Sequence, residues 1–122
     1  MLYMESPAAA IEFYKNAFGA VEQWRVSNED GSVHVAEMTI ETAVFRFHEE
    51  VTRVRELSPA TLGGTSVVIG LLVADPHAVA AKAVAVGAEE ISPVTDYEYG
   101  YRQGTVKDPF GHYWQVEKKL SM

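Results

Sequence analysis

Residues 76–87 read PHAVAAKAVAVG, and the chain carries an earlier version of the same pattern at residues 7–19, which read PAAAIEFYKNAFG. In both stretches a capping residue, Ser6 or Asp75, stands before a proline, which suits the first position of a helix. Both continue as alanine-rich amphipathic sequence and end at a glycine, a residue that readily takes the left-handed conformation found at helix ends. The offset of 68 to 69 residues predicts two helices, the first over 6–18, in an internally duplicated chain.

The sequence around each helix predicts the same succession of strands. Strands are expected at 2–4, 21–27, around 33–38 and 43–48 in the first half, and at 66–73, 88–94, 99–107 and 112–118 in the second. The continuous apolar run SVVIGLLV at 66–73 predicts a strand that is buried on both faces. Each half therefore reads strand, helix, strand, strand, strand, which indicates an α+β fold made of two βαβββ units.

The length of 122 residues suits one domain or two small halves that share a core. We expect a single domain over 1–122, with repeat one at about 1–50 and repeat two at about 65–120. The linker between them, about 51–64, is polar and without sustained periodicity, and is expected to be mobile.

Composition narrows the classes of partner. A hydrophobic content of 48% predicts a packed core rather than disorder. The net charge of −7 argues against nucleic acid as a partner, and it suits ordinary solubility more than a dedicated site for cations. No apolar run approaches the ~18 residues of a membrane span, and no secretory leader is recognisable, so no membrane partner is expected. Cysteine is absent, which fits a cytoplasmic location.

The strand at 43–48, AVFRFH, alternates strictly. Phe45 and Phe47 point to one face, whereas Arg46 and His48 point to the other. An unpaired charge is costly to bury, so the sequence leaves two interpretations of Arg46. In the first, its planar guanidinium recognises an anionic ligand. In the second, it forms a salt bridge with a carboxylate such as that of Glu37 or Glu41.

Three motifs connect the chain to a known family. The stretch AIEFYKNAFGA at 10–20 and the turn DPFGHYW at 108–114, together with the duplication, resemble the vicinal oxygen chelate superfamily. That superfamily contains glyoxalases, bleomycin-resistance proteins and dioxygenases. The segment YGYRQGTVKDPFGHYW, from Tyr99 onward, is most similar to the glyoxalase-like branch named after the phosphonate-operon protein. The resemblance implies a curved, cup-like mixed sheet with helices on its outer face, and a homodimer as the usual state.

The resemblance also implies four strand positions at which catalytic members hold a divalent metal with His and Glu. The first position would precede Met1, and the second is occupied by Arg46. The third, six residues before Asp75, is Ile69, and the fourth, seven residues after Asp108, is Gln115. None of these residues is a family ligand, so we expect no metal, no other cofactor and no catalytic residue of the family type.

The family geometry implies a largely apolar cavity with a few polar groups, as in small-molecule sites. The residues expected to face it are Val44, Arg46, His48, Ile69, Leu71, Tyr113 and Gln115. His48 or Tyr113 is a candidate for proton transfer, although neither has an orienting partner that the sequence identifies.

An aromatic row completes the candidate site. Tyr97, Tyr99 and Tyr101 alternate, which places them on one strand face if the strand begins that early, and together with Trp24 they could stack on a flat ligand. The alternative is a packed sheet face or a dimer contact. On the other side of the sheet we expect Arg102 to pair with an acidic residue.

We therefore predict a small-molecule-binding protein of the glyoxalase/bleomycin-resistance type, without a catalytic metal and more a binder than an enzyme. One alternative is a divalent-metal-dependent lyase, transferase or dioxygenase of the same superfamily. A second alternative is a non-catalytic dimeric domain that binds a protein partner.

Overall fold

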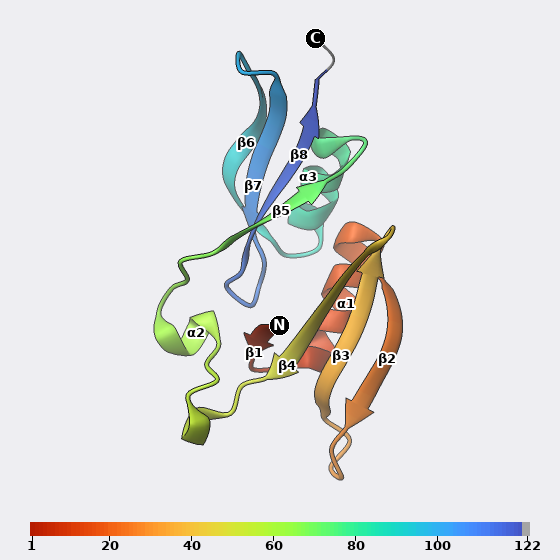
Figure 1. The fold of residues 1–122 in the computed structure, drawn as a ribbon, viewed down its shortest axis with the longest axis vertical. Helices are drawn as coiled ribbons and strands as arrows, with labels where there is room; N and C mark the ends of the chain where they lie inside the picture. Colours follow the sequence, from red (N-terminus) through yellow and green to blue (C-terminus); the bar gives the residue numbers. More distant parts are fainter. Residues whose placement is uncertain (121–122) are drawn as a thin grey trace. The chain divides into compact units, whose positions relative to one another are not determined.

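The computed structural model describes residues 1–120, and it divides the chain into two compact units, Met1–Thr65 and a second unit that begins at Ser66. The first unit contains β1 (Leu2–Met4), α1 (Pro7–Phe18), β2 (Val21–Ser27), β3 (Val33–Ile40), β4 (Ala43–Glu49), the 3-10 helix η1 (Thr52–Val54) and α2 (Pro59–Leu62). The second contains β5 (Val68–Leu72), α3 (Pro76–Ala85), β6 (Glu89–Tyr97), β7 (Tyr101–Lys107) and β8 (Tyr113–Lys119). Figure 1 shows the helices and strands of each unit.

Both units have the same topology. The strand orders are β1-β4-β3-β2 and β5-β8-β7-β6, and in each sheet the first strand pairs parallel with the last while the other pairs are antiparallel. The predicted α+β fold of two βαβββ units is therefore confirmed. None of the helices within residues 1–120 has the length and apolar character that crossing a membrane requires.

The two duplicated helices begin as the capping pattern predicts. The Ser6 side chain accepts a hydrogen bond from the Ala9 amide, and the Asp75 side chain accepts one from the Ala78 amide. Gly19 follows α1 with φ of 67°, a left-handed conformation that costs a glycine little.

Each helix covers one face of its sheet. In the first unit Tyr14 of α1 is fully buried, and its ring packs edge-on against Phe45 and Phe47 of β4. In the second unit Trp114 and Val116 of β8 are buried on the face that packs against α3. These contacts confirm the alternation in β4 and β8, the last strand of each unit. The residues between the buried ones face away from the helix.

The prediction that residues 66–73 are buried on both faces is wrong. β5 is an edge strand, and Val68 and Leu72 are 55% and 69% exposed, whereas Leu71 between them is buried. The continuous apolar run hid this difference between the two faces, because it contains no polar residue to mark the alternation.

The predicted mobile linker at 51–64 is organised as part of the first unit. The Glu50 carboxylate accepts hydrogen bonds from the Ser58 amide at 3.1 Å and from the Thr61 hydroxyl at 2.7 Å. Ser58 is buried and caps α2, and the Tyr3 hydroxyl donates to Glu56 at 2.8 Å. Side-chain hydrogen bonds of this kind produce no hydrophobic periodicity, so they could not be predicted from the sequence pattern.

Candidate functional site

Each sheet has an open face, by which we mean the face opposite the helix of its own unit. Residues paired directly across strands point to the same face, so the register defines the members of each face. On the first sheet the open face contains Tyr3, Trp24, Val35, Glu37, Thr39, Val44, Arg46 and His48. On the second it contains Val68, Gly70, Leu72, Tyr101, Gln103, Thr105, Lys107, Tyr113, Gln115 and Glu117.

Three consecutive strands of the first sheet place Trp24, Glu37 and Arg46 side by side. Glu37 of β3 stands opposite Trp24 of β2 and opposite Arg46 of β4. Arg46 donates from Nε to Glu37 Oε1 at 2.9 Å, and its guanidinium carbon lies 5.4 Å from the centre of the Trp24 ring. We call these three residues the stacking triad.

The stacking triad presents a flat and electrically balanced surface. The side chain of Arg46 remains 54% exposed, and Trp24 is 39% exposed. The ion pair engages Nε, so the two terminal nitrogens of the guanidinium lie outside this contact. Of the two interpretations of Arg46, the salt bridge to Glu37 is the one that the structure contains.

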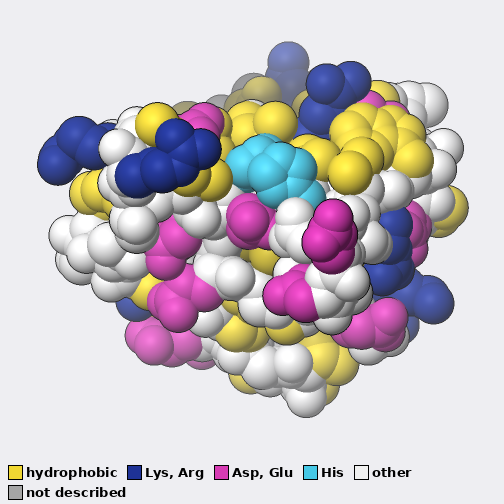
Figure 2. Space-filling view, turned by 90° about the horizontal axis from the view of Figure 1, so that it is seen from below, with side chains coloured by type: hydrophobic (Ala, Val, Ile, Leu, Met, Phe, Trp, Pro, Cys, Tyr) yellow, Lys and Arg dark blue, Asp and Glu magenta, His cyan; other side chains and the backbone are white. Residues whose placement is uncertain are grey.

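His48 lies two residues beyond Arg46 on the same face. Its ring packs 4.3 Å from that of His34 and 5.7 Å from that of Tyr3, and its Nδ1 lies 2.5 Å from the backbone oxygen of Glu49. Figure 2 shows histidine side chains gathered beside acidic and apolar ones on the surface seen from below. Tyr3 has a raised pKa because its hydroxyl donates to the Glu56 carboxylate. Sequence reasoning named His48 but missed both rings that pack against it.

On the second sheet a series of side-chain hydrogen bonds ends at Glu117. The Gln103 amide donates to Glu117 Oε1 at 3.0 Å, and the Gln115 amide donates to the same oxygen at 3.3 Å. The Tyr99 hydroxyl in turn donates to Gln103 Oε1. Glu117 was not predicted as a site residue, although the alternation that placed Tyr113 and Gln115 on this face continues to it.

Ile69 and Leu71 do not share the open face with Tyr113 and Gln115, contrary to the sequence prediction. Ile69 pairs with the buried Trp114, so its side chain points to the helix side of the sheet. The neighbour of Gln115 on the open face is Gly70, where an added Cβ would lie 3.0 Å from Glu117 Oε2. The error is one residue of register, which moves a strand residue to the opposite face.

The three tyrosines surround a hairpin turn instead of sharing one strand. Tyr97 ends β6, Tyr99 lies in the turn and Tyr101 begins β7. The rings of Tyr97 and Tyr99 nevertheless stack, with centres 5.2 Å apart and planes 12° apart. Residues 95–97, predicted as a loop, belong to the strand. The structure brings the tyrosines together within the second unit, whereas Trp24 belongs to the first.

Arg102 pairs with an acidic residue, as predicted. It donates from Nε to Asp96 at 2.6 Å and from Nη2 at 3.0 Å, and these bonds lower the pKa of the Asp96 carboxyl. This bidentate pair joins β6 to β7 beside the tyrosine turn.

The residues at the family's metal positions do not fit a divalent ion. Arg46 is a cation that cannot donate an electron pair, and neither Ile69 nor its open-face neighbour Gly70 has a donor side chain. Gln115 offers one amide oxygen, a weak ligand compared with a carboxylate. These side chains therefore do not form a divalent-metal site.

Comparison with known proteins agrees with the duplicated fold. Residues 1–116 match the Glyoxalase/Bleomycin resistance protein/Dioxygenase superfamily. An uncharacterized protein of Mycobacterium bovis is 36% identical over 118 residues, which are 94% of this chain and 78% of that protein. The X-ray structure of a gene product from Arabidopsis thaliana has 34% identity and a TM-score of 0.75, and covers 95% of this chain and 93% of its own.

A third similar protein supports the fold alone. TioX from Micromonospora sp. ML1 has 24% identity and a TM-score of 0.78, with 98% of this chain and 94% of that chain covered. The duplicated topology, the capped helices and the match over residues 1–116 together identify the family. The chain belongs to the glyoxalase/bleomycin resistance protein/dioxygenase superfamily.

Proposed function

We propose that this protein binds a small organic molecule on its open sheet faces, as the bleomycin-resistance members of its superfamily do, without a metal at the family's ligand positions. The observation that carries the proposal is the stacking triad. An exposed arginine paired with Glu37 contributes at most about 1 kcal/mol to stability, and an exposed cation–π contact about 0.5–1 kcal/mol. What supports ligand recognition is the exposed planar surface that the guanidinium of Arg46 and the ring of Trp24 form together.

The triad favours a flat ligand over a strongly charged one. A planar heteroaromatic group can stack on the Trp24 ring or on the guanidinium plane of Arg46. Glu37 balances the charge of Arg46, so the arginine does not exclude a cationic ligand from this surface. The net charge of −7 then favours a cationic heteroaromatic compound such as bleomycin over an anionic one.

Intrinsic fluorescence tests the proposal, because the chain has two tryptophans in different environments. Trp24 is exposed, and Trp114 is buried and donates from its indole to Asp108 at 2.9 Å. Titration with bleomycin is expected to quench the emission of Trp24. In the variant Trp24→Phe the remaining emission comes from Trp114 and should not respond. Quenching that persists in Trp24→Phe would contradict binding at the triad.

The metal-dependent enzyme remains the competing function within the superfamily. The side chains at Arg46, Gly70 and Gln115 weigh against a metal-dependent enzyme, because none of them is a carboxylate or an imidazole. Elemental analysis of untagged protein tests this part of the proposal. A stoichiometric divalent ion that survives dialysis would overturn it.

We also propose a homodimer. Support comes from Val44, Val68 and Leu72, apolar residues of the open faces that are each more than half exposed. Sedimentation at two concentrations should give the dimer mass for the natural chain and the monomer mass for Leu72→Glu. A monomer at both concentrations would instead favour a protein partner of another kind.

Two finer assignments complete the proposal. The motif from Tyr99 to Trp114 supports placement in the branch named after the phosphonate-operon protein. The absence of cysteine supports a cytoplasmic location, which fractionation of cells that express the chain would test.

A further inference from the structure

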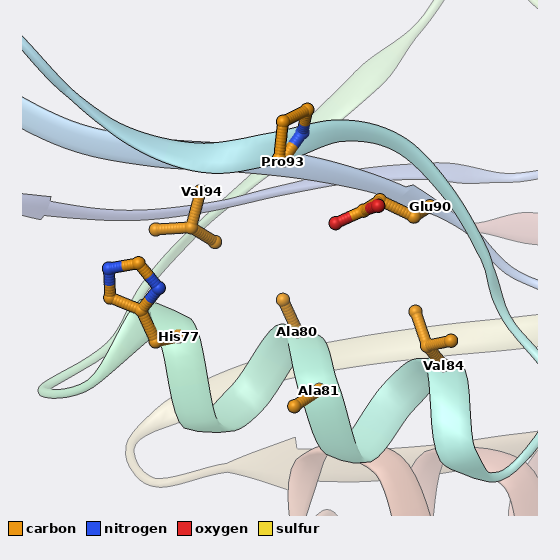
Figure 3. Close-up of a pocket in the computed structure, with 7 residues that line it drawn as sticks. All are labelled: His77, Ala80, Ala81, Val84, Glu90, Pro93 and Val94. Carbon is orange, nitrogen blue, oxygen red and sulfur yellow. The ribbon is translucent and has the colours of Figure 1, made fainter.

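The second unit contains a cavity that is separate from its open face. It has a volume of about 460 Å³ and lies between α3 and β6, on the helix side of the sheet. Its floor is one stripe of α3, made of His77, Ala80, Ala81 and Val84 (Figure 3). These residues are spaced three and four apart, so they share a helix face. Ligand cavities in proteins typically measure about 300–1,000 Å³, so this one can hold a small organic molecule.

The cavity results from small side chains on the second helix. The capping residues Ser6 and Asp75 are 69 positions apart, and this offset aligns Ala80 with Ile11 of the first unit. Ile11 is buried in the first unit at 2% exposure, whereas the aligned position of the second unit has the single methyl group of Ala80, which lines a cavity open to solvent. The same offset aligns Ala83 with Tyr14, so the first helix has large side chains at positions where the second has alanine.

The opposite wall is an irregular part of β6. The pairing of β6 with β7 shifts register between Glu90 and Ser92 and again between Ser92 and Thr95. Pro93 lies between these shifts and cannot donate a backbone hydrogen bond to the ladder. Bulges of this kind bend a strand, and here Glu90, Pro93 and Val94 of the bent strand line the cavity, with the Val94 side chain pointing to the helix (Figure 3).

The polar groups of the cavity define the chemistry of an occupant. Figure 3 shows the Glu90 carboxylate lying over α3 between Ala80 and Val84, while the His77 ring stands beside Val94 at the other end. The rest of the lining is alanine, valine and proline. A carboxylate beside apolar walls suits a cation with an apolar body, because the ammonium can pair with the acid while the body leaves water.

We propose that this cavity binds a small arylalkylammonium ion, with its ammonium on Glu90 and its apolar part against Ala80, Val84 and Val94. The ring of His77 borders the aromatic part of the ligand. The site is independent of the stacking triad, since its residues all belong to α3 and β6 and lie on the other side of the second sheet from Gln115.

The proposal is tested by titrating the ¹⁵N-labelled full chain with 2-phenylethylammonium chloride, and in parallel with sodium 3-phenylpropanoate. We expect saturable shifts of the amides of 77–84 and 89–94 with the ammonium compound and at least tenfold weaker binding of the carboxylate. Shifts at other amides, or equal binding of the two probes, would overturn the proposal.

Variants separate charge from shape. Glu90→Gln should weaken binding of the ammonium compound at least fivefold. Ala80→Leu, which fills the cavity, should weaken its binding at least tenfold. The matched control is Ala78→Leu, since Ala78 is on the same helix but does not line the cavity. Trp24→Ala should leave this binding unchanged, even if it abolishes binding at the triad. Unaltered affinity in both Glu90→Gln and Ala80→Leu would refute the site.

Discussion

Arg46 and Glu37 stand directly opposite each other on β4 and β3, and Arg46 donates from Nε to Glu37 at 2.9 Å. Glu37 neutralises the positive charge of Arg46 on the sheet face, in a chain whose net charge is −7. Glu37 balances the charge of Arg46 and the Trp24 ring lies against its guanidinium, so under the proposed function Arg46 would offer a flat surface more than a binding site for anions.

Removal of the balancing charge should change ligand preference more than stability. We expect Glu37→Gln to lower the free energy of unfolding by less than about 1 kcal/mol, because the Arg46 side chain is half exposed. The released cation should bind 2-naphthoate about five- to tenfold more tightly in calorimetric titrations, which corresponds to about 1–1.4 kcal/mol. The control is Glu22→Gln, which breaks the exposed pair of Glu22 with Arg25 at 2.6 Å and should leave this affinity unchanged.

The turn before β8 depends on one buried carboxylate. Asp108 is 3% exposed and accepts hydrogen bonds at 2.9 Å from the amides of Phe110 and His112 and from the indole of Trp114. Asp108→Ala removes these three hydrogen bonds to a buried group, so urea denaturation should show a loss of roughly 2–4 kcal/mol. A loss under about 0.5 kcal/mol, typical of surface changes, would show that the hydrogen bonds do not matter.

Gly104 is required by the close approach of β6 to β7. A Cβ added there would lie 2.6 Å from Val94 Cγ2 and 2.8 Å from the Val94 backbone nitrogen. We expect Gly104→Ala to destabilise the chain by about 1–3 kcal/mol. Gly64→Ala is the control, since no atom lies within 4 Å of its added Cβ. Equal melting temperatures for the two variants would contradict this packing.

Acid should loosen residues 56–64 before it unfolds the first sheet. Hydrogen bonds from Thr61 and Ser58 lower the pKa of Glu50 below its usual value of 4.5. A lowered folded-state pKa means that this stabilisation is complete above the pKa of the unfolded chain and is lost as pH falls through the folded-state value.

Hydrogen exchange of the amides in 58–64, compared between pH 6 and pH 3.5 after correction for intrinsic rates, measures the effect. Glu50→Gln should show the faster exchange already at pH 6. Protection that is the same at both pH values in the natural chain would contradict the role of Glu50.

Local signals in the sequence predicted the two duplicated helices and the last strand of each unit correctly, but not η1 and α2. Caps and terminal glycines such as Ser6 and Gly19 act within one turn, so no tertiary information was needed. The alternation of Phe45, Arg46 and Phe47 likewise fixed two opposite faces, and the structure has them as predicted.

The failures came from features that depend on partner strands. The apolar run around Ile69 carries no alternation, so its inward and outward residues could not be distinguished. The stacking triad depends on the register of β2 with β3, which contains irregularities after Glu22 and Val26. Sequence reasoning therefore missed the contact of Trp24 with Arg46.

Calorimetric titration of the full chain with bleomycin, compared with Trp24→Ala and Trp24→Phe, tests the central claim most directly. We expect saturable binding by the natural chain, at least tenfold weaker binding by Trp24→Ala and a partial recovery with phenylalanine, whose ring can still stack. Equal affinity of the natural chain and Trp24→Ala would contradict ligand recognition by the stacking triad.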